Sequence, residues 1–357
     1  MNVVNGVCCK PFPQKDTAMK FAGCDLHKQT ITICVVDQSR RVLERRTVRC
    51  GEERTILAFF ERLGDFEAVV EATASYEWFV RLIEPVAHRV LLAHPKKLRV
   101  IAESTRKSDR LDAQILAEFL ALDMIPTSYR ATPRQHEHRR LVRQRGGVQR
   151  RLTSVKNRLR RILCDYNADR PSLFTVDGLA YLAQVPLSGA DRFAVDQMVE
   201  ELHFGRRQLL AVNARLKEFA EAAPLCEQEA RTLLRTIPGV GFVTTEVVLA
   251  ELADIDRFGS QKRVVAYAGL SPGQRESAGK SRELHLEKNG STLLRSTLVE
   301  AAWRLVQHSL RWRRIYERLK LRVRAKKAIV AVARRLLCLM TAILKTGQPY
   351  SVSQQPT

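Results

Sequence analysis

The chain has 357 residues, 45% of them hydrophobic, and its 60 Lys and Arg residues outnumber 38 Asp and Glu, giving a formal net charge of +22. This length suffices for two or three domains with cores of their own, and the lack of any apolar run of roughly 18 residues argues against a membrane span. The basic excess makes a polyanion, above all nucleic acid, the expected partner.

The first 18 residues contain no apolar segment of the kind that a signal peptide needs. Met19 stands directly before the first strand pattern, so residues 1–18 are predicted to be a disordered leader. The eight cysteines are scattered, and none has zinc-ligand spacing. Reduced thiols in a cytoplasm are therefore expected.

Residues 19–130 are predicted to form an α/β domain. Its strands are expected at 20–25, 30–37, 41–49, 66–71 and 89–93, and its helices at 52–63, 78–86 and 111–122. Three successive strands followed by alternating helices and strands give a mixed sheet with helices on its faces. This element order matches the ribonuclease H-like fold.

Residues 131–227 are predicted to form a basic helical linker. Helical spacing of apolar residues marks 133–165 and a second long stretch from about Asp191 to Ala222, which fit an antiparallel hairpin or a coiled coil. The cations of the first helix have few acidic neighbours, which favours phosphate contact over a solvated charged face. The residues expected to bind nucleic acid are Arg139, Arg140, Arg143, Arg150, Arg151, Lys156 and Arg158.

Residues 228–345 are predicted to form a third, mainly helical unit, with a disordered tail at 346–357. A Pro-Gly-Val-Gly turn containing Gly239 and Gly241 precedes an apolar helix, as in a helix-hairpin-helix motif. Glycines in such a turn let backbone N–H groups and a helix N-terminus approach phosphate. A turn of this kind also joins ordinary helices, so both interpretations remain open.

A polar loop is expected at 271–282. Arg275, Lys280 and Arg282 lie on either side of Ser277 in this segment, and cations near a serine can bind a phosphate and stabilise developing negative charge. No histidine is close in sequence to act as a base for the serine. The residues alone therefore predict a loop that contacts phosphate, and nothing more for Ser277.

Four acidic residues stand at the edges of apolar runs in the first domain. Asp25 and Glu71 end predicted strands, while Asp109 and Asp112, three positions apart on a helix, face the same way. If the two strands are neighbours, all four can meet at one sheet edge and supply the oxygen ligands that two Mg²⁺ ions need for phosphodiester chemistry. The structural alternative is a turn at Asp25, a helix N-cap at Asp109 and a salt bridge from Asp112 to an arginine.

Several segments carry a resemblance to a known family. In the first third of the chain they are Gly-Cys-Asp-Leu-His-Lys from Gly23, Glu-Ala-Thr from Glu71 and Lys-Ser-Asp-Arg-Leu-Asp-Ala from Lys107. In the last third they are Ile-Pro-Gly-Val-Gly from Ile237, Ala-Tyr-Ala-Gly-Leu-Ser-Pro from Ala266 and Leu-Val-Glu-Ala-Ala-Trp from Leu298. In these segments and their order, the chain resembles the insertion-sequence-110 family of transposases over about 19–340. The third segment, and the Gly-Leu-Ser-Pro with the serine loop after it, are the most specific parts.

The resemblance implies a RuvC-like domain with a DEDD carboxylate set, a coiled-coil link and a C-terminal transposase domain with a catalytic serine. Asp25, Glu71, Asp109 and Asp112 are then the Mg²⁺ ligands, and Ser277 is the nucleophile. The implied reaction is serine attack on a DNA phosphodiester, a covalent phosphoserine link and strand exchange, guided by a bridge RNA that pairs with target and donor DNA. In an implied homodimer or homotetramer, the carboxylates of one protomer complete the serine site of another.

One departure from the family pattern concerns the serine loop. It reads Glu276-Ser277-Ala278-Gly279, where relatives often have two serines followed by glycines. Ala278 restricts the backbone if that position needs a positive φ. Two other hypotheses also fit the residues: a metal-dependent junction nuclease whose C-terminal domain only grips DNA, and a non-catalytic basic protein that binds nucleic acid.

Overall fold

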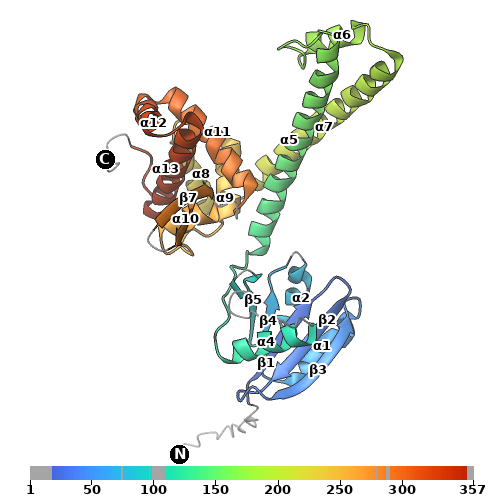
Figure 1. Cartoon of the computed structure of the whole chain (residues 1–357). Helices are drawn as coiled ribbons and strands as arrows, with labels where there is room; N and C mark the ends of the chain where they lie inside the picture. Colours follow the sequence, from blue (N-terminus) through green and yellow to red (C-terminus); the bar gives the residue numbers. More distant parts are fainter. Residues whose placement is uncertain are drawn as a thin grey trace, which may run out of the picture. The chain divides into compact units, whose positions relative to one another are not determined.

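The computed structural model describes residues 18–73, 75–95, 97–98, 109–277, 280–286 and 290–351. The chain divides into two compact units, one up to Arg130 and one from Ala131 (Figure 1). The domain bounds predicted from the sequence at 130/131 and 227/228 stay predictions. The predicted leader, apart from Ala18, lies outside the described residues.

A mixed five-stranded sheet forms the framework of the first unit. Its strands are β1 (Lys20–Leu26), β2 (Thr30–Val36), β3 (Val42–Arg49), β4 (Phe66–Glu71) and β5 (Arg89–Ala93), each within one residue of its predicted bounds. The strand order is β3-β2-β1-β4-β5. β1 pairs antiparallel with β2 and parallel with β4, β2 pairs antiparallel with β3, and β4 pairs parallel with β5. This arrangement is consistent with a ribonuclease H-like domain.

Helices cover both faces of this sheet. Alternate strand residues point to opposite faces, so Cys24 packs with the face that carries α1 (Glu53–Leu63) and α2 (Tyr76–Ile83). Val69 packs on the other face, beneath α4 (Asp109–Ala121). The strands β1, β2 and β4 are therefore buried on both sides, as their continuous apolar sequences predict. The edge strand β3, which carries several charged residues, is largely exposed.

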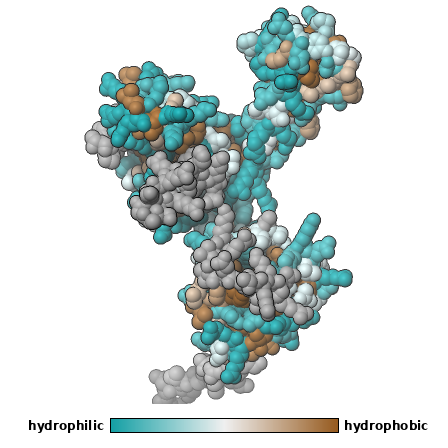
Figure 2. Space-filling model, viewed as in Figure 1, coloured by the Kyte–Doolittle hydropathy of each residue, from teal (hydrophilic) through white to brown (hydrophobic). Residues whose placement is uncertain are grey.

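The second unit begins with a long antiparallel pair of helices, which we call the arm (Figure 1). It consists of α5 (Pro133–Asp165), α6 (Val176–Gln184) and α7 (Gly189–Glu221). Thr132 starts α5 with a reciprocal capping box, with proline at the next position. Contacts from Arg145 to Asn213 and from Arg158 to Glu201 show that α7 runs back along α5. The apolar side chains pack between the helices, and Figure 2 shows that the surface of the arm is largely hydrophilic.

The rest of the second unit is a helical bundle. Its elements are α8 (Leu225–Arg235), α9 (Phe242–Leu252), α10 (Gln261–Tyr267), the hairpin of β6 (Pro272–Ser277) and β7 (Lys280–Leu286), α11 (Thr292–His308), α12 (Leu310–Arg322) and α13 (Ala325–Thr346). Val142 of α5 and Leu216 of α7 belong to the same apolar core as Leu298 and Leu336 of the bundle. This shared core explains why the arm and the bundle form one unit.

A buried ionic network also joins the arm to the bundle. Glu246 of α9 is fully buried, and its carboxylate accepts hydrogen bonds of 2.9 and 3.1 Å from Arg231 of α8. His138 Nε2 of α5 lies 2.9 Å from the same carboxylate. Glu227 bridges Arg231 and Arg134 of α5. Burial acts to raise the pKa of Glu246, but the hydrogen bonds and positive charges of His138 and Arg231 outweigh it, so the pKa lies below the ordinary glutamate value.

The structure differs from the sequence prediction in two segments. The segment at 271–282 was expected to be a loop, but it contains most of the β6–β7 hairpin. Tyr350 lies in the predicted disordered tail, yet its hydroxyl accepts a hydrogen bond from Trp312 and its N–H donates to Thr236. Residues 352–357 lie outside the described residues.

Two expected absences concern membranes and disulfides. Among the described helices, none combines the length and the apolar character needed to cross a membrane. The described cysteines are Cys24, Cys34, Cys50, Cys164, Cys226 and Cys338, and all six are free thiols.

Candidate active site

Asp25 and Glu71 occupy adjacent positions on neighbouring strands. The parallel register of β1 and β4 runs to the pair Cys24 and Val70, and Asp25 and Glu71 are the next residue on each strand. Cys24 and Val70 both pack on the α1–α2 face, so Asp25 and Glu71 belong to the opposite face, which α4 covers. The condition that the two strands be neighbours is met.

The helix α4 lies directly on β1 at Gly23. A Cβ atom on Gly23 would lie 2.0 Å from the carbonyl oxygen of Ala113 and 2.5 Å from the backbone nitrogen of Ala117. Ala113 follows Asp112, and Gly23 precedes Asp25 by two positions on the same face of the sheet. This contact places α4 over β1 two positions before Asp25. Among the described side chains, Asp25, Glu71 and Asp112 do not lie close enough together to hold one metal ion.

The described carboxylates differ in their surroundings. Asp25 has a side chain only 13% exposed, and its Oδ2 lies 3.0 Å from Nε2 of His27. Glu71 is half-buried and Asp112 is exposed, while the side chain of Asp109 lies outside what the structure describes. His27 is not among the site residues predicted from the sequence, and its place just beyond the end of β1, two residues after Asp25, was the available signal.

At the ends of β1 and β4 the available metal ligands are oxygen atoms, and the nearest thiol does not suit a metal. Burial, followed by the negative charge of Asp25, raises the pKa of the Cys24 thiol, so this thiol stays protonated and is a poor metal ligand. The hydroxyl oxygen of Thr73, two residues past Glu71, is buried and has no hydrogen-bond partner in the described part of the chain. Carboxylate and hydroxyl oxygens suit Mg²⁺.

A complete metal site is not formed by the described side chains. Among them, no group of three or more His, Cys, Asp or Glu residues is close enough to hold a metal ion. That set does not contain Asp109, the remaining member of the predicted four. The donor types and the placement of Asp25, Glu71 and α4 nevertheless fit a divalent cation.

Ser277 is the last residue of β6. The hairpin register pairs Ser277 with Lys280 and Arg275 with Arg282. Because residues two apart on a strand share a face, the serine position and the three predicted cation positions lie on one face of the hairpin. The side chains of these four residues lie outside what the structure describes, so the backbone register alone defines this cluster.

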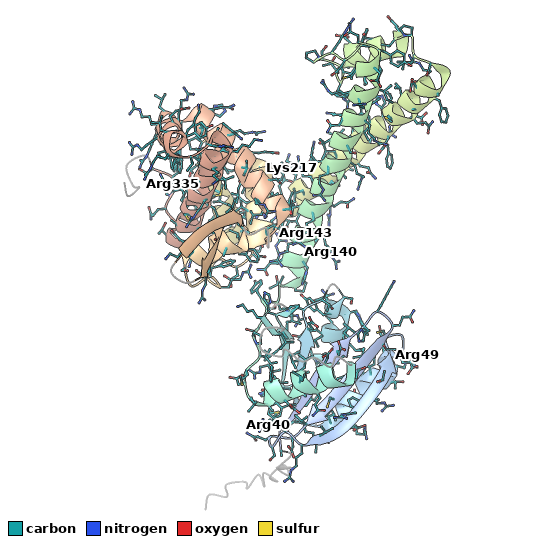
Figure 3. The ribbon with its side chains drawn as sticks, in the orientation of Figure 1. Arg40, Arg49, Arg140, Arg143, Lys217 and Arg335 are labelled. Atoms are coloured by element: carbon teal, nitrogen blue, oxygen red, sulfur yellow. The ribbon has the colours of Figure 1, made fainter. Side chains whose placement is uncertain are left out.

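Several cations predicted to bind phosphate are engaged within the protein. Arg143 makes two hydrogen bonds of 2.9 Å to the buried carboxylate of Glu251, and Arg139 donates to the carbonyl oxygen of Ala250. Arg158 and Arg151 donate to Glu201 and Gln208 of α7, and Lys156 lies over the ring of Phe174. Arg140 and Arg150 are exposed, without a partner among the described residues. Figure 3 shows Arg140 and Arg143 on α5.

The two glycines of the predicted helix-hairpin-helix motif have different surroundings. Gly239 has φ +78°, and a Cβ there would lie 3.0 Å from the backbone nitrogen of Leu305 on α11. Its lack of a side chain thus serves packing within the bundle. Gly241 is the N-cap of α9 and faces open space, so only this glycine leaves room for a phosphate.

Two family models match the chain over the two regions that carry these features. A transposase model with the designation DEDD_Tnp_IS110 matches residues 22–168. A second model, described as "Transposase IS116/IS110/IS902 family", matches residues 231–317. The fold and the matches therefore define a DEDD-type transposase, a class of enzyme that cleaves and recombines DNA and generally depends on a divalent metal ion. The chain belongs to the IS110 family of insertion-sequence transposases.

Individual relatives extend the similarity over most of the chain. The transposase for insertion sequence element IS1111A of Coxiella burnetii is 25% identical over 81% of this chain and 79% of its own. The transposase for insertion sequence element IS1328 of Yersinia enterocolitica is 26% identical over 78% and 82%. The pilin gene-inverting protein of Moraxella bovis is 24% identical over 92% and 97%.

Proposed function

We propose that this transposase cleaves and exchanges DNA strands through a serine nucleophile and a Mg²⁺-dependent carboxylate set, and that a structured bridge RNA guides it to target and donor DNA. The observation that carries the proposal is the adjacency of Asp25 and Glu71 on parallel β1 and β4, on the sheet face that α4 covers. Carboxylates that only cap a helix or face solvent would not need to lie side by side on two paired strands.

Asp25, Glu71, Asp109 and Asp112 are the residues that would hold the metal. Bound Mg²⁺ supplies charge stabilisation for a phosphoryl group and orients the reacting oxygens. His27, 3.0 Å from one oxygen of Asp25, positions that carboxylate. The close contact of α4 with Gly23 fixes the helix that carries the two remaining acids.

Ser277 is the proposed nucleophile. Its hydroxyl oxygen would form a bond to phosphorus while one P–O bond of the DNA breaks, and the released DNA hydroxyl would keep the strand end available for rejoining. Lys280 opposite it, and Arg275 and Arg282 two positions along, place three cations on the same face of the hairpin. Positive charge there offsets the negative charge that develops on the phosphoryl oxygens.

The guide RNA and the oligomer are inferred from the family resemblance together with the net charge of +22. Such a charge attracts any nucleic acid, so it supports an RNA partner without specifying one. The direct test is to purify the protein from its native locus and sequence the RNA that accompanies it. A discrete non-coding RNA from the flank of the element supports guidance, whereas random cellular RNA contradicts it. Light scattering of the purified complex tests for a homodimer or homotetramer.

The catalytic proposal is tested with paired substitutions. With native RNA, cognate DNA and Mg²⁺, Ser277→Ala and Asp25→Asn should both abolish strand cleavage, and Ser277→Ala should remove the covalent protein–DNA species. Ser281→Ala, at the hairpin position paired with Glu276, and Glu61→Gln, on the exposed side of α1, are matched controls that should retain activity. Cleavage that survives Ser277→Ala but not Asp25→Asn would indicate a metal-dependent nuclease. No Mg²⁺-dependent cleavage by the wild-type protein would indicate a nucleic-acid-binding protein.

A further inference from the structure

Four arginines form a stripe along α12. Arg311, Arg314, Arg318 and Arg322 are spaced by three, four and four residues. At 100° per residue they fall within an arc of about 80° on one side of the helix. We call this set the arginine stripe.

Three of the four arginines in the stripe are unpaired in the part of the chain that the structure describes. Arg314, Arg318 and Arg322 are exposed, and among the described residues none of the three has a hydrogen-bond or ion-pair partner. Glu317 is the only acid of α12, and it lies 3.6 Å from Lys320, outside the stripe. α13, which packs beside α12 and contains Arg335 (Figure 3), has no acidic residue at all.

The contrast with α5 is informative, because the sequence drew attention to that helix first. Most of the α5 arginines predicted to meet phosphate bind carboxylates, amides or carbonyl oxygens of the protein. Such pairing satisfies their donors and lowers their attraction for an external anion. Arg314, Arg318 and Arg322 of α12 have no such partner among the described residues.

The surroundings of the stripe indicate the kind of polyanion. Proteins that bind single strands stack bases on exposed aromatic rings. The aromatic residues of α12, Trp312 and Tyr316, are buried in the bundle core, 1% and 6% exposed, so the stripe offers charge without a stacking surface. This composition suits the paired strands of a duplex, whose bases are not available for stacking.

We propose that the arginine stripe of α12 binds the phosphates of duplex DNA. The twelve residues from Arg311 to Arg322 span about 16 Å of helix, and phosphates of one DNA strand recur every 3.4 Å along its axis. The stripe thus matches about five consecutive phosphates of one strand. Its contacts are independent of base sequence, so they add affinity and leave target choice to other parts of the complex. The choice of DNA as the polyanion rests on the proposed function.

The test compares two charge-matched variants of the full-length protein. One carries Arg314→Gln, Arg318→Gln and Arg322→Gln. The other carries Arg140→Gln, Arg150→Gln and Arg161→Gln, which removes three exposed cations of α5 that have no partner in the described part of the chain. Binding to a 30-base-pair duplex of unrelated sequence is followed by fluorescence anisotropy over a range of salt concentrations, in EDTA and without RNA. Unchanged melting temperatures confirm that both variants fold.

The stripe variant should bind duplex DNA at least about tenfold more weakly, and the slope of log K against log salt should fall by about 2 to 3, because each lost phosphate contact removes about 0.9. The α5 variant should lose less on both measures. An equal or larger loss in the α5 variant would overturn the proposal, as would a loss confined to an RNA duplex of the same length. Because the assay contains no metal and involves no cleavage, its result is separate from that of Ser277→Ala.

Discussion

Gly23 allows a test of the active-site geometry that leaves every carboxylate in place. In Gly23→Ala, the new methyl group would lie 2.0 Å from the Ala113 carbonyl oxygen and 2.5 Å from the Ala117 nitrogen. Both are backbone atoms of α4, so no side-chain rotation relieves the overlap. The helix must move away from β1 by at least about 1 Å, and overpacking of this kind costs about 1–3 kcal/mol.

The same displacement moves Asp109 and Asp112 relative to Asp25 and Glu71. A misplacement of about 1 Å in a catalytic group can lower the rate about a hundredfold. Gly23→Ala should therefore lower both the melting temperature and the rate of Mg²⁺-dependent cleavage of cognate DNA. The matched control is Gly51→Ala in the same unit, where a Cβ would meet nothing within 4 Å.

The two measurements separate the possible outcomes. A variant with the wild-type melting temperature would contradict the close packing of α4 on β1. A variant that is destabilised but cleaves DNA at the wild-type rate would show that the acids of α4 take no part in catalysis. Cleavage should be measured well below the melting temperature, so that lost activity does not merely report unfolding.

Two further predictions concern the ionic network at the base of the arm. Arg231→Met removes the two hydrogen bonds that Arg231 donates to the fully buried carboxylate of Glu246. It should lower the free energy of unfolding, measured in urea titrations, by about 3–5 kcal/mol. Arg235→Met, one turn further along α8 and exposed, should change it by less than about 0.5 kcal/mol, and similar losses in the two variants would contradict the assigned role. Glu246 and Glu227, despite burial that acts to raise their pKa values, have pKa values lowered by His138, Arg231 and Arg134. Their contribution to stability is thus present above the ordinary glutamate pKa of about 4.3 and is lost as the pH falls below it. Acid titration of Arg231→Met should therefore show a smaller loss of stability than that of the wild-type protein. An identical pH dependence in both proteins would refute this coupling.

The sequence predicted much of the first unit because its signals are local. Continuous apolar strands and the helical spacing of 52–63 depend only on neighbouring residues, and all five strands follow the prediction. The pairing of β1 with β4 depends on contacts between residues far apart in the sequence. The sequence could therefore predict that Asp25 and Glu71 are adjacent only if these two strands are neighbours. The reason for Gly23 was also hidden, because it depends on a helix that is ninety positions away.

In the second unit, the charge pattern of the sequence did not separate arginines that are paired within the protein from those that are not. Arg139 and Arg143 look the same in sequence as Arg140, but their partners lie on α9, more than a hundred residues later. The β6–β7 hairpin lacks the alternation of apolar and polar residues that marks a half-buried strand, so its polar residues suggested a loop. The stripe on α12 has clear helical spacing, yet only the lack of partners for Arg314, Arg318 and Arg322 among the described residues separates it from other basic helices.

The length of the arm gives the ionic network at its base a mechanical role. With 33 residues, α5 extends about 50 Å, so a tilt of 5° at its base would swing the distal end by about 4 Å. Apolar packing alone tolerates small rotations, whereas the paired hydrogen bonds among Arg134, Glu227, Arg231 and Glu246 have fixed directions. These charged residues at the base of the arm thus set the position of any partner that binds near α6, at its opposite end.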